Sequence, residues 1–407
     1  MQNAKIYSML VSLIALAGTL LSSSVISSLT NSATITSSGK IVTTSPLHID
    51  GRYIKNSFNR TIMLRGVNKV EFADDPDGIW MSNTMWNDGN VAAELDAMKS
   101  WGINVIRCHM SVETWKFNIG PNSGHPASPY CTLPAREAIK RLIVMAAERG
   151  MYVILDGYTV RSYWSGGNQD PLPYPPYQTS ARASEVIASE AEFVDWWVSV
   201  AKELKVYPNV LFELWNEPHG DEAAQASWKR VAQQCINAIR SEGAQQIIIL
   251  QWGYGVWAGL ASGDGEGMEW ILDFNLTDPL GNILYSTHVY RIYGGCGLWQ
   301  YLESEKGTPF GYLYDDVKMA FQIEKLDWVG DVLNKPLFIG ETGCDLMWTG
   351  DELQRELIAW NNTLKIFNEW GLHYAAFWWR EIGTFPLHYG PPNFSPTNSG
   401  QILKDNL

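Results

Sequence analysis

The stretch Asn209-Val-Leu-Phe-Glu-Leu-Trp-Asn-Glu-Pro218 decides the fold of this chain of 407 residues. The run from Val210 to Leu214 is apolar except for Glu213, which predicts a short buried strand. Pro218 ends the strand, because proline can neither donate to a strand ladder nor continue a helix. Asn216 and Glu217 therefore lie where a parallel strand passes into its loop. In barrels of alternating strands and helices, catalytic groups gather at that edge.

The carboxyl group of Glu217 has two interpretations at this position. Next to the amide of Asn216, it is a candidate general acid with a positioning partner. The alternative is an ordinary ion pair with a lysine or arginine at the root of a loop, an interaction that is common and contributes little energy. The sequence outside this stretch favours the first interpretation.

Similar apolar runs recur along the chain. They predict eight inner strands, at residues 62–67, 103–107, 152–156, 210–214, 246–252, 283–288, 336–341 and 374–378. Continuous apolar runs are typical of parallel strands that are buried on both faces. Eight of them, mostly separated by helices, predict an α/β fold with a single (β/α)8 TIM barrel and long loops after the strands. A small N-terminal hairpin, with arms at 48–54 and 60–62, is expected to close the barrel floor.

Helical spacing fills most of the segments between these strands. We expect helices at residues 91–101, 134–149, 185–207, 222–242, 312–333 and 352–370. Gly102 and Gly150 follow two of them, as glycine does at the end of a helix. The connection between strands five and six is the weakest, with only a poor helical candidate at 268–274.

The N-terminal region differs in composition from the rest of the chain. Lys5 precedes an apolar run that ends at Leu21, and serine and threonine dominate residues 22–45. This pattern predicts a signal peptide or N-terminal anchor over residues 1–28, a flexible linker over 29–46 and one catalytic domain over 47–407. An uncleaved anchor stays open as an alternative, because the apolar run is only just shorter than the ~20 residues of a membrane span. We expect a secreted protein without stable membrane association.

Charge and aromatic content limit the partners. A formal charge of −13 disfavours nucleic acid, whose phosphates require a basic face. The 19 tryptophans and 18 tyrosines offer ring faces on which sugars stack, although some of these rings are expected to be core. That alternative is preferred for four tryptophans in predicted helices: Trp101, Trp196, Trp228 and Trp360. The five cysteines are odd in number, so at least one has no partner within the chain, and Cys296 and Cys344 could form a disulfide.

Polar residues stand at or just after the ends of the predicted strands, which converge on one mouth in a barrel. They are Arg107, Asp156, Asn216, Glu217, His288, Tyr290, Glu341 and Trp378. Glu217 and Glu341 belong to strands four and seven and would face each other across the mouth. Two carboxyl groups in different environments hydrolyse glycosidic bonds, one by donating a proton to the leaving oxygen and the other by attacking the anomeric carbon.

This ordered series resembles glycoside hydrolase family 5, the endoglucanase family of clan A. Asn216-Glu217-Pro218 and Ile339-Gly-Glu341 carry the resemblance, together with Arg107, His288-Val-Tyr290 and Trp378. The closing segment Asn398-Ser-Gly-Gln-Ile-Leu-Lys-Asp405 is also similar to that of bacterial and archaeal cellulases in the family. The resemblance covers the chain from about residue 47 to its end.

The resemblance implies a secreted, retaining endo-β-1,4-glucanase that needs no cofactor. Glu217 would act as the acid and then as the base, and Glu341 would be the nucleophile, with carboxyl groups roughly 5 to 5.5 Å apart. Asn216 would bind the 2-hydroxyl of the reacting sugar. The partner would be a polysaccharide such as cellulose or β-glucan, and the protein would be a monomer.

The resemblance also implies supporting roles. Arg107 and Tyr290 would keep Glu341 ionised, His288 would set the proton affinity of Glu217, and Trp378 would form the floor of the −1 subsite. From the residues alone, Arg107 could instead be a purely structural ion pair and His288 a core histidine. Trp379 is the alternative to Trp378, because neighbouring side chains point to opposite sides of a strand.

One departure from the family concerns the third strand. Family members often carry histidine two residues after its aspartate, whereas Asp156 is followed by Gly157 and Tyr158. The phenol of Tyr158 could replace the imidazole as a donor to the sugar, but it carries no charge near neutral pH.

Three rival functions remain open. They are a β-mannanase or other β-glycanase on the same barrel, a sugar-binding protein without catalysis, and a metal-dependent hydrolase. Asp74, Asp75 and Asp77 offer oxygen ligands for a structural metal such as Ca²⁺, but they lack a full calcium-binding loop pattern, so we expect no metal. The metal-dependent hydrolase ranks last because the chain has no His-x-His or His-Glu-x-x-His cluster. For a glycanase, an open cleft would be lined by six tryptophans of the upper loops: Trp80, Trp86, Trp164, Trp252, Trp299 and Trp348.

Overall fold

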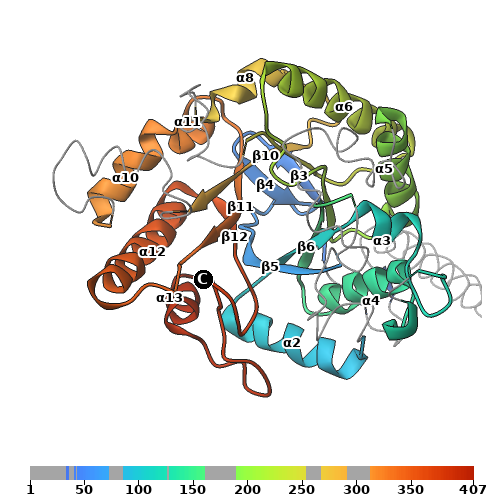
Figure 1. Ribbon diagram of the computed structural model, residues 1–407. Helices are drawn as coiled ribbons and strands as arrows, with labels where there is room; N and C mark the ends of the chain where they lie inside the picture. Colours follow the sequence, from blue (N-terminus) through green and yellow to red (C-terminus); the bar gives the residue numbers. More distant parts are fainter. Residues whose placement is uncertain are drawn as a thin grey trace, which may run out of the picture.

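Eight parallel strands form a closed barrel in the computed structural model (Figure 1), which confirms the predicted TIM barrel. The structure describes residues 34–35, 41–42, 44–72, 86–125, 128–160, 189–253, 267–290 and 312–407. The strands pair in chain order, and the last pairs with the first. They are β5 (Arg65–Phe72), β6 (Val105–Met110), β7 (Tyr152–Gly157), β8 (Val210–Glu213), β9 (Ile248–Gln251), β10 (Ile283–Tyr290), β11 (Leu337–Gly343) and β12 (His373–Ala376).

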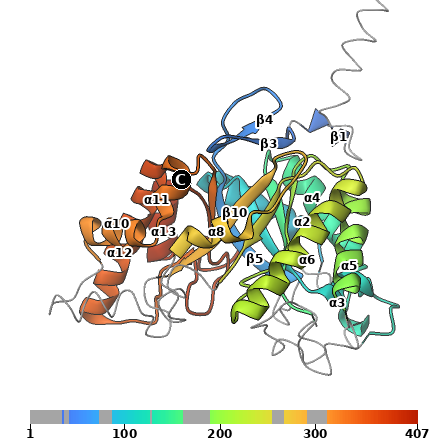
Figure 2. The same ribbon diagram turned by 90° about the horizontal axis from the view of Figure 1, so that it is seen from above.

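Helices surround the barrel (Figures 1 and 2). The longer ones are α2 (Asp88–Trp101), α4 (Ala135–Ala147), α5 (Glu190–Leu204), α6 (Glu222–Ser241), α10 (Tyr314–Ile323), α12 (Gly350–Trp370) and α13 (Asn398–Asn406). Shorter turns of helix are α3 (Val112–Lys116), η1 (Ser128–Tyr130), η4 (Gly267–Glu269), α8 (Trp270–Phe274) and α11 (Leu326–Asp331). None of these helices is long and apolar enough to cross a membrane.

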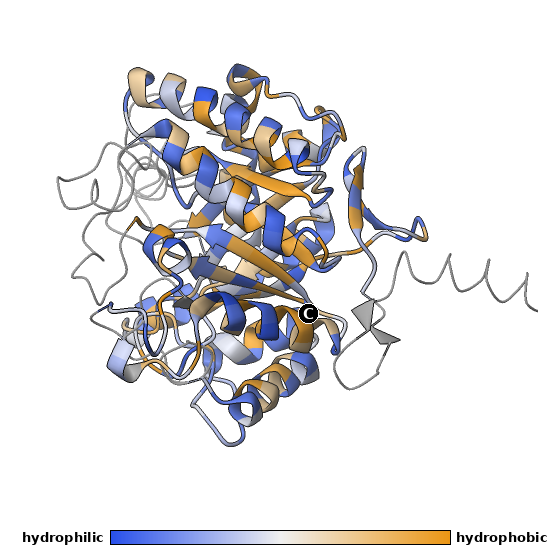
Figure 3. Ribbon diagram, turned by 90° about the vertical axis from the view of Figure 1, so that its right-hand side faces the viewer, coloured by the Kyte–Doolittle hydropathy of each residue, from blue (hydrophilic) through white to orange (hydrophobic). Residues whose placement is uncertain are grey.

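Local sequence explains where several helices begin and end. The side chain of Asn87 accepts hydrogen bonds from the first turn of α2, and Ser189 and Asp221 do the same for α5 and α6. Gly102 ends α2 with φ of 102°, as its position predicted. The apolar faces of the helices pack on the strands, whereas hydrophilic residues colour their outer faces (Figure 3). The four helical tryptophans that the sequence assigned to the core are buried.

A small antiparallel hairpin lies at the N-terminal end of the barrel strands (Figure 2). Its arms are β3 (Leu47–Asp50) and β4 (Tyr53–Asn56), joined through Gly51 at φ of 59°. The sequence predicted arms at 48–54 and 60–62, but the first of these ranges reaches into both strands of the hairpin. Thr61 adds only an isolated antiparallel bridge to Lys55 of β4. Leu47 and Ile54 pack into the apolar floor of the barrel. A second short pair, β1 (Thr34–Ile35) with β2 (Ile41–Val42), precedes it.

Several inner strands extend further toward their carboxyl ends than the apolar runs predicted. β5 was expected at 62–67 and β6 at 103–107, so Arg107 lies inside β6 rather than at its end. The reason is that Asn68, Arg107 and His109 face the lumen of the barrel, where polar residues interrupt the apolar run without ending the strand. β12, by contrast, ends at Ala376, so Trp378 follows the strand instead of closing it.

The helix predicted at 312–333 is two helices. α10 and α11 are separated by Lys325, which has φ of 61° and therefore cannot continue α10. Glu324, just before this break, is buried, and that burial raises its pKa to about 8.

The barrel interior is layered along the strand direction. Apolar side chains such as Val105, Ile154 and Leu211 fill the half near the hairpin. Two residues further along the same strands, the lumen carries Arg107, Asp156 and Glu213 instead. Because side chains alternate along a strand, each of these polar residues lies on the same face as its apolar predecessor. The apolar layer thus forms a dry floor beneath a charged one.

Candidate active site

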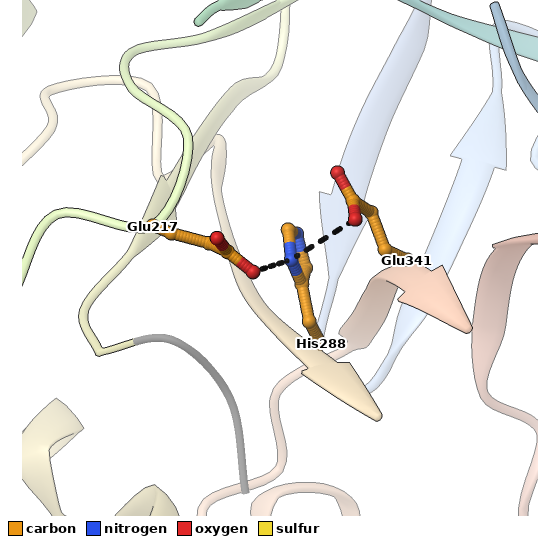
Figure 4. A group of neighbouring side chains, drawn as sticks. All are labelled: Glu217, His288 and Glu341. Carbon is orange, nitrogen blue, oxygen red and sulfur yellow. Dashed lines mark hydrogen bonds and ion pairs between the residues drawn. The ribbon is translucent and has the colours of Figure 1, made fainter. Parts of the chain in front are cut away.

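Two glutamates approach each other at the carboxyl ends of the strands. Glu341 belongs to β11, and Glu217 follows β8 in the loop that Pro218 begins. One carboxylate oxygen of each lies within 4.8 Å of the other, with His288 of β10 between them (Figure 4). The Nδ1 atom of His288 is 2.7 Å from Glu217 Oε1 and 3.7 Å from Glu341 Oε2.

The backbone of Glu217 is fixed by hydrogen bonds to both neighbouring strands. Glu217 has φ of 47°, a left-handed conformation that is uncommon for glutamate. Its N–H donates to Gln251 Oε1 at 3.2 Å, and the preceding Asn216 N–H donates to Gly157 O at 2.7 Å. Gly253 N–H donates to Pro218 O at 2.7 Å on the other side. These contacts hold an unfavourable conformation that aims the carboxyl group at Glu341.

The carboxylate of Glu341 is held by two donors. Arg107 Nη1 donates to Oε1 at 2.9 Å, and the hydroxyl of Tyr290 donates to Oε2 at 2.9 Å. Burial alone would raise the pKa of Glu341, but the charges of His288 and Arg107 outweigh it and lower the pKa. Glu341 is therefore ionised over the whole neutral range.

The pKa of Glu217 is shifted in the opposite direction. Burial raises it, and the negative charge of Glu341 adds to that effect, while the charge and hydrogen bond of His288 oppose it. The net result is a raised pKa, so Glu217 keeps its proton to higher pH than a free glutamate. Its side chain is 24% exposed and can reach a bound molecule. One proton donor and one anion thus face each other, the combination that acid and nucleophile require.

Arg107 lies fully buried beneath the pair. Its Nε and Nη2 atoms bind the two carboxylate oxygens of Glu213 at 2.6 and 3.1 Å, and Nη2 also contacts Asp156 at 3.1 Å and Asn216 Oδ1 at 2.8 Å. Burial acts to lower the pKa of Arg107, but the surrounding carboxylates raise it well above its ordinary value. Arg107 thus pairs with Asp156 and with Glu341 at once.

The crowding of carboxyl groups around Arg107 affects the pKa of Asp156. It is completely buried, and that burial raises its pKa well above the ordinary value despite the nearby guanidinium of Arg107. The negative charges of Glu213 and Glu341 act in the same direction. Because one guanidinium meets three carboxyl groups here, a proton on Asp156 relieves the repulsion among them.

The two adjacent tryptophans after β12 have different environments. Trp378 is half-buried and stacks on Phe377 with ring centroids 4.7 Å apart, and the guanidinium of Arg380 lies 4.7 Å from its ring. Trp379 is 1% exposed and packs edge-on against Trp101 at 4.8 Å. Of the two, Trp378 is the one available to a ligand. Tyr158 is also half-buried, with its ring 4.6 Å from that of His109.

The tryptophans expected to line a cleft separate into three groups. Trp86 is buried and its Nε1 donates to Asp88 at the start of α2, so its assignment to the cleft was wrong. Trp252 is partly buried against Phe274, whereas Trp348 is 41% exposed on the loop after β11. The remaining three, Trp80, Trp164 and Trp299, lie outside the described residues.

Two further expectations fall partly outside the described residues. The candidate metal ligands Asp74, Asp75 and Asp77 lie outside the described residues. Cys296, the expected disulfide partner of the buried Cys344, also lies outside them. Glu217, His288 and Glu341 are close enough to share a cation. The guanidinium of Arg107 at 2.9 Å from Glu341 opposes a cation there by charge repulsion.

Three residues that contact this site were not singled out from the sequence. Asn68 accepts from Arg107 at 2.9 Å and donates to Gly340 O and Ala375 O, which ties the guanidinium to β11 and β12. Gln251 holds the backbone of Glu217, and the Nε2 of His109 lies 3.4 Å from Glu341. The signal for His109 was its spacing, since a residue two positions after Arg107 lies on the same strand face.

Comparisons with known proteins agree with this geometry. The family model of Cellulase (glycosyl hydrolase family 5) matches residues 59–381. The chain is 26% identical over 250 residues to Endoglucanase CelA of Streptomyces lividans, covering 60% of this chain and 42% of that protein. It is 24% identical over 121 residues to a mannan endo-1,4-beta-mannosidase of Cellvibrio japonicus, covering 29% of this chain and 26% of that protein. The match thus spans less than half the length of these curated relatives.

Solved structures show the same fold. A hyperthermophilic endocellulase from the archaeon Pyrococcus horikoshii superposes with a TM-score of 0.65 at 21% identity, covering 89% of this chain and 98% of that chain. The endocellulase of that organism has also been solved in complex with cellotetraose. Because the family model covers most of the chain, the protein belongs to the cellulase family, glycosyl hydrolase family 5.

Proposed function

We propose that the protein is a retaining endo-β-1,4-glucanase that hydrolyses internal bonds of cellulose or related β-glucans. The observation that carries the proposal is the pair Glu217 and Glu341, with oxygens within 4.8 Å and pKa values shifted in opposite directions. Retaining enzymes keep their carboxyl groups roughly 5 to 5.5 Å apart, whereas inverting ones need roughly 6.5 to 9.5 Å for a water molecule.

In the first step, the ionised carboxylate of Glu341 attacks the anomeric carbon of the sugar. Glu217 gives its proton to the glycosidic oxygen as that bond breaks, and a glycosyl ester on Glu341 remains. Arg107 and Tyr290 hold Glu341 in place for the attack by their hydrogen bonds to its two oxygens.

In the second step, Glu217 acts as a base. Once Glu341 is esterified, its negative charge is lost, and that charge is one of the causes that raise the pKa of Glu217. The pKa of Glu217 therefore falls at the moment when a base is needed. It takes a proton from a water molecule that attacks the anomeric carbon, and Glu341 is released with net retention of configuration.

Asn216 and Trp378 would bind the reacting sugar. The Oδ1 atom of Asn216 accepts from Arg107 at 2.8 Å, which leaves its amide N–H groups to donate to a 2-hydroxyl. Trp378 would provide the ring on which the −1 sugar stacks, with Tyr158 near the same subsite. No cofactor enters this mechanism, because each step uses only carboxyl groups and water.

The test compares wild type with Glu217→Gln and Glu341→Gln on a soluble cellulose derivative, with folding checked by circular dichroism. Both variants are expected to lose hydrolysis, and the wild-type product is expected to keep the β configuration when followed by NMR. Full activity in either variant, or inverted product from the wild type, would contradict the assignment.

A β-mannanase is the second candidate, favoured by the similarity to a mannan endo-1,4-beta-mannosidase. Glucose and mannose differ at the 2-hydroxyl, which is the group assigned to Asn216. Product analysis on cellulose, mannan and xyloglucan separates the two functions. A sugar-binding protein without catalysis would bind cello-oligosaccharides and release no reducing ends.

We also propose a secreted, monomeric protein with a leader or anchor over residues 1–28, a linker over 29–46 and the catalytic domain over 47–407. The composition of residues 1–46 supports this division. N-terminal sequencing of protein recovered from the medium tests it, and sedimentation tests the oligomeric state.

A further inference from the structure

A buried histidine that has no role in the mechanism above contacts both Arg107 and Glu341. His109 belongs to β6 and is 2% exposed. Its Nε2 atom lies 2.8 Å from Arg107 Nη1 and 3.4 Å from Glu341 Oε1. Asp156 Oδ2 on the neighbouring β7 is 3.7 Å from the same atom. The imidazole thus lies among the charged groups that surround the proposed nucleophile.

The shorter contact determines which tautomer His109 adopts. Arginine is always a donor, so a 2.8 Å hydrogen bond to Arg107 requires an unprotonated Nε2 atom. Burial lowers the pKa of His109 to about 4, which leaves the ring neutral near pH 7. In this tautomer Nδ1 carries the hydrogen.

This arrangement is not one that stability alone would favour. The Nδ1 atom of His109 is buried and has no hydrogen-bond partner among the described residues. A buried N–H group without a partner is destabilising, and such groups are rare in folded proteins. The ring is fixed by packing instead, with Tyr158 at 4.6 Å and Phe377 at 6.3 Å between ring centroids.

The contact with His109 also means that Nη1 of Arg107 is shared among several acceptors. Nη1 has two hydrogens but faces three acceptors, which are Asn68 Oδ1 at 2.9 Å, Glu341 Oε1 at 2.9 Å and His109 Nε2 at 2.8 Å. His109 and Asn68 contact Nη1 in addition to Glu341, so together with the contacts of Nε and Nη2 they orient the guanidinium toward the carboxylate.

We propose that His109 is a positioning residue for the nucleophile: its Nε2 accepts from Arg107 and keeps the guanidinium oriented toward Glu341, while Tyr158 braces the ring. This inference rests on the proposed function, because it takes Glu341 as the nucleophile. It gives Tyr158 a second role besides the proposed contact with the sugar, because its ring packs against the imidazole of His109.

The test uses three substitutions and two substrates. His109→Leu removes the acceptor, His109→Gln places an amide oxygen near the position of Nε2, and His109→Asn places one near Nδ1. The substrates are a soluble cellulose derivative and dinitrophenyl β-cellobioside, whose leaving group departs without help from an acid. Tm is measured for each variant, and His373→Leu serves as a control, since His373 is a buried histidine that accepts from Leu64 N–H outside the site.

His109→Leu is expected to lower kcat about ten- to a hundredfold on both substrates, with KM within about twofold of wild type, because a displaced nucleophile slows chemistry more than binding. His109→Gln is expected to recover most of the rate and His109→Asn little of it. His373→Leu is expected to lower Tm and leave kcat of the folded protein unchanged.

Wild-type kcat in His109→Leu would overturn the proposal, and so would a His109→Gln variant as slow as His109→Asn. If His109→Leu does not fold, the Gln and Asn pair still decides. A defect of His109→Leu that disappears on the dinitrophenyl substrate would also overturn it, since that result places the defect on the acid. Activity in Glu341→Gln would instead refute the proposed function, so the two failures are distinguishable.

Discussion

The hydroxyl of Tyr290 donates a hydrogen bond of 2.9 Å to Glu341 Oε2 across two adjacent strands of the barrel. β10 and β11 are paired so that His288 lies opposite Glu341, and Tyr290 lies opposite Gly343. The same register therefore delivers a histidine to one side of the carboxylate and a phenol to the other. Burial and the charge of Glu341 both raise the pKa of Tyr290, so the phenol stays protonated and remains a donor.

Replacing Tyr290 by phenylalanine removes this donor. A hydrogen bond to a charged group contributes about 1.5 to 3 kcal/mol, so the pKa of Glu341 should rise and kcat should fall roughly ten- to a hundredfold. The acidic limb of the pH–rate profile is expected to move to higher pH, because the nucleophile works only when ionised. An acidic limb at the wild-type position in Tyr290→Phe would contradict this role.

The rate should decline at alkaline pH because of Glu217. Its pKa is raised, and the first step needs its protonated form, so activity falls as the pH rises through that value. The wild type should show this alkaline limb on a soluble cellulose derivative, and the limb should be absent on dinitrophenyl β-cellobioside, whose leaving group needs no acid. On the dinitrophenyl substrate, Glu217→Ala should likewise show no such limb, and added azide should yield a β-glycosyl azide. A limb that survives in the variant would belong to another group.

Gly340 lies directly behind the imidazole of His288. A Cβ at this position would be 2.9 Å from His288 Nε2 and 3.0 Å from Ser286 Oγ, so Gly340→Ala must displace the histidine. We expect kcat to fall at least tenfold, since a shift of about 1 Å in a catalytic group has effects of this size. Denaturant unfolding shows whether the variant is still folded. Wild-type activity would mean that the position of His288 does not matter to Glu217.

Removing Arg107 should destabilise the whole domain. Arg107→Leu leaves Asp156, Glu213 and Glu341 without their cation, which is expected to lower the free energy of unfolding by about 3 to 5 kcal/mol. Arg107→Lys keeps a charge but loses the two-pronged contact with Glu213, so it should be destabilised less. Urea unfolding measures both. Equal stability of Arg107→Leu and wild type would contradict the network.

Glu324 predicts a pH dependence of stability away from the active site. Its pKa is near 4.5 when unfolded and about 8 when folded, so the folded state favours the protonated form. Its stabilising contribution is complete below about pH 4.5 and is lost as the pH rises through about 8. Glu324→Gln cannot ionise and should therefore be more stable than wild type at pH 9, by roughly 2 to 5 kcal/mol, relative to their difference at pH 4.

The sequence predicted the barrel because its inner strands are buried on both faces. Runs such as Val210 to Leu214 contain almost no polar residue, so they are recognised as buried strands even when their first and last residues are predicted wrongly. The ends themselves were less predictable. Asn68 and His109 are polar yet lie within strands, because polar and charged side chains line the lumen near the carboxyl ends of the strands, whereas apolar side chains fill the half near the hairpin.

The candidate site was partly predictable for a related reason. Glu217, Glu341 and His288 come from strand ends that any barrel brings together, so their proximity followed from the topology. The hydrogen bond between His109 and Arg107 depends on side-chain rotamers, and the burial of Trp86 depends on its bond to Asp88. Neither leaves a periodic signal in the sequence.

The first residues of the loop after β8 are held in place by hydrogen bonds to the adjacent strands. Asn216, Glu217 and Pro218 are each hydrogen-bonded to a residue of β7 or to the end of β9, and this anchoring is complete by Pro218. Segments grafted from relatives after His219 should therefore change which polymer is accommodated without moving the acid. One loop of the barrel can therefore change its substrate range through the residues after His219 while the residues up to Pro218 keep the acid in place.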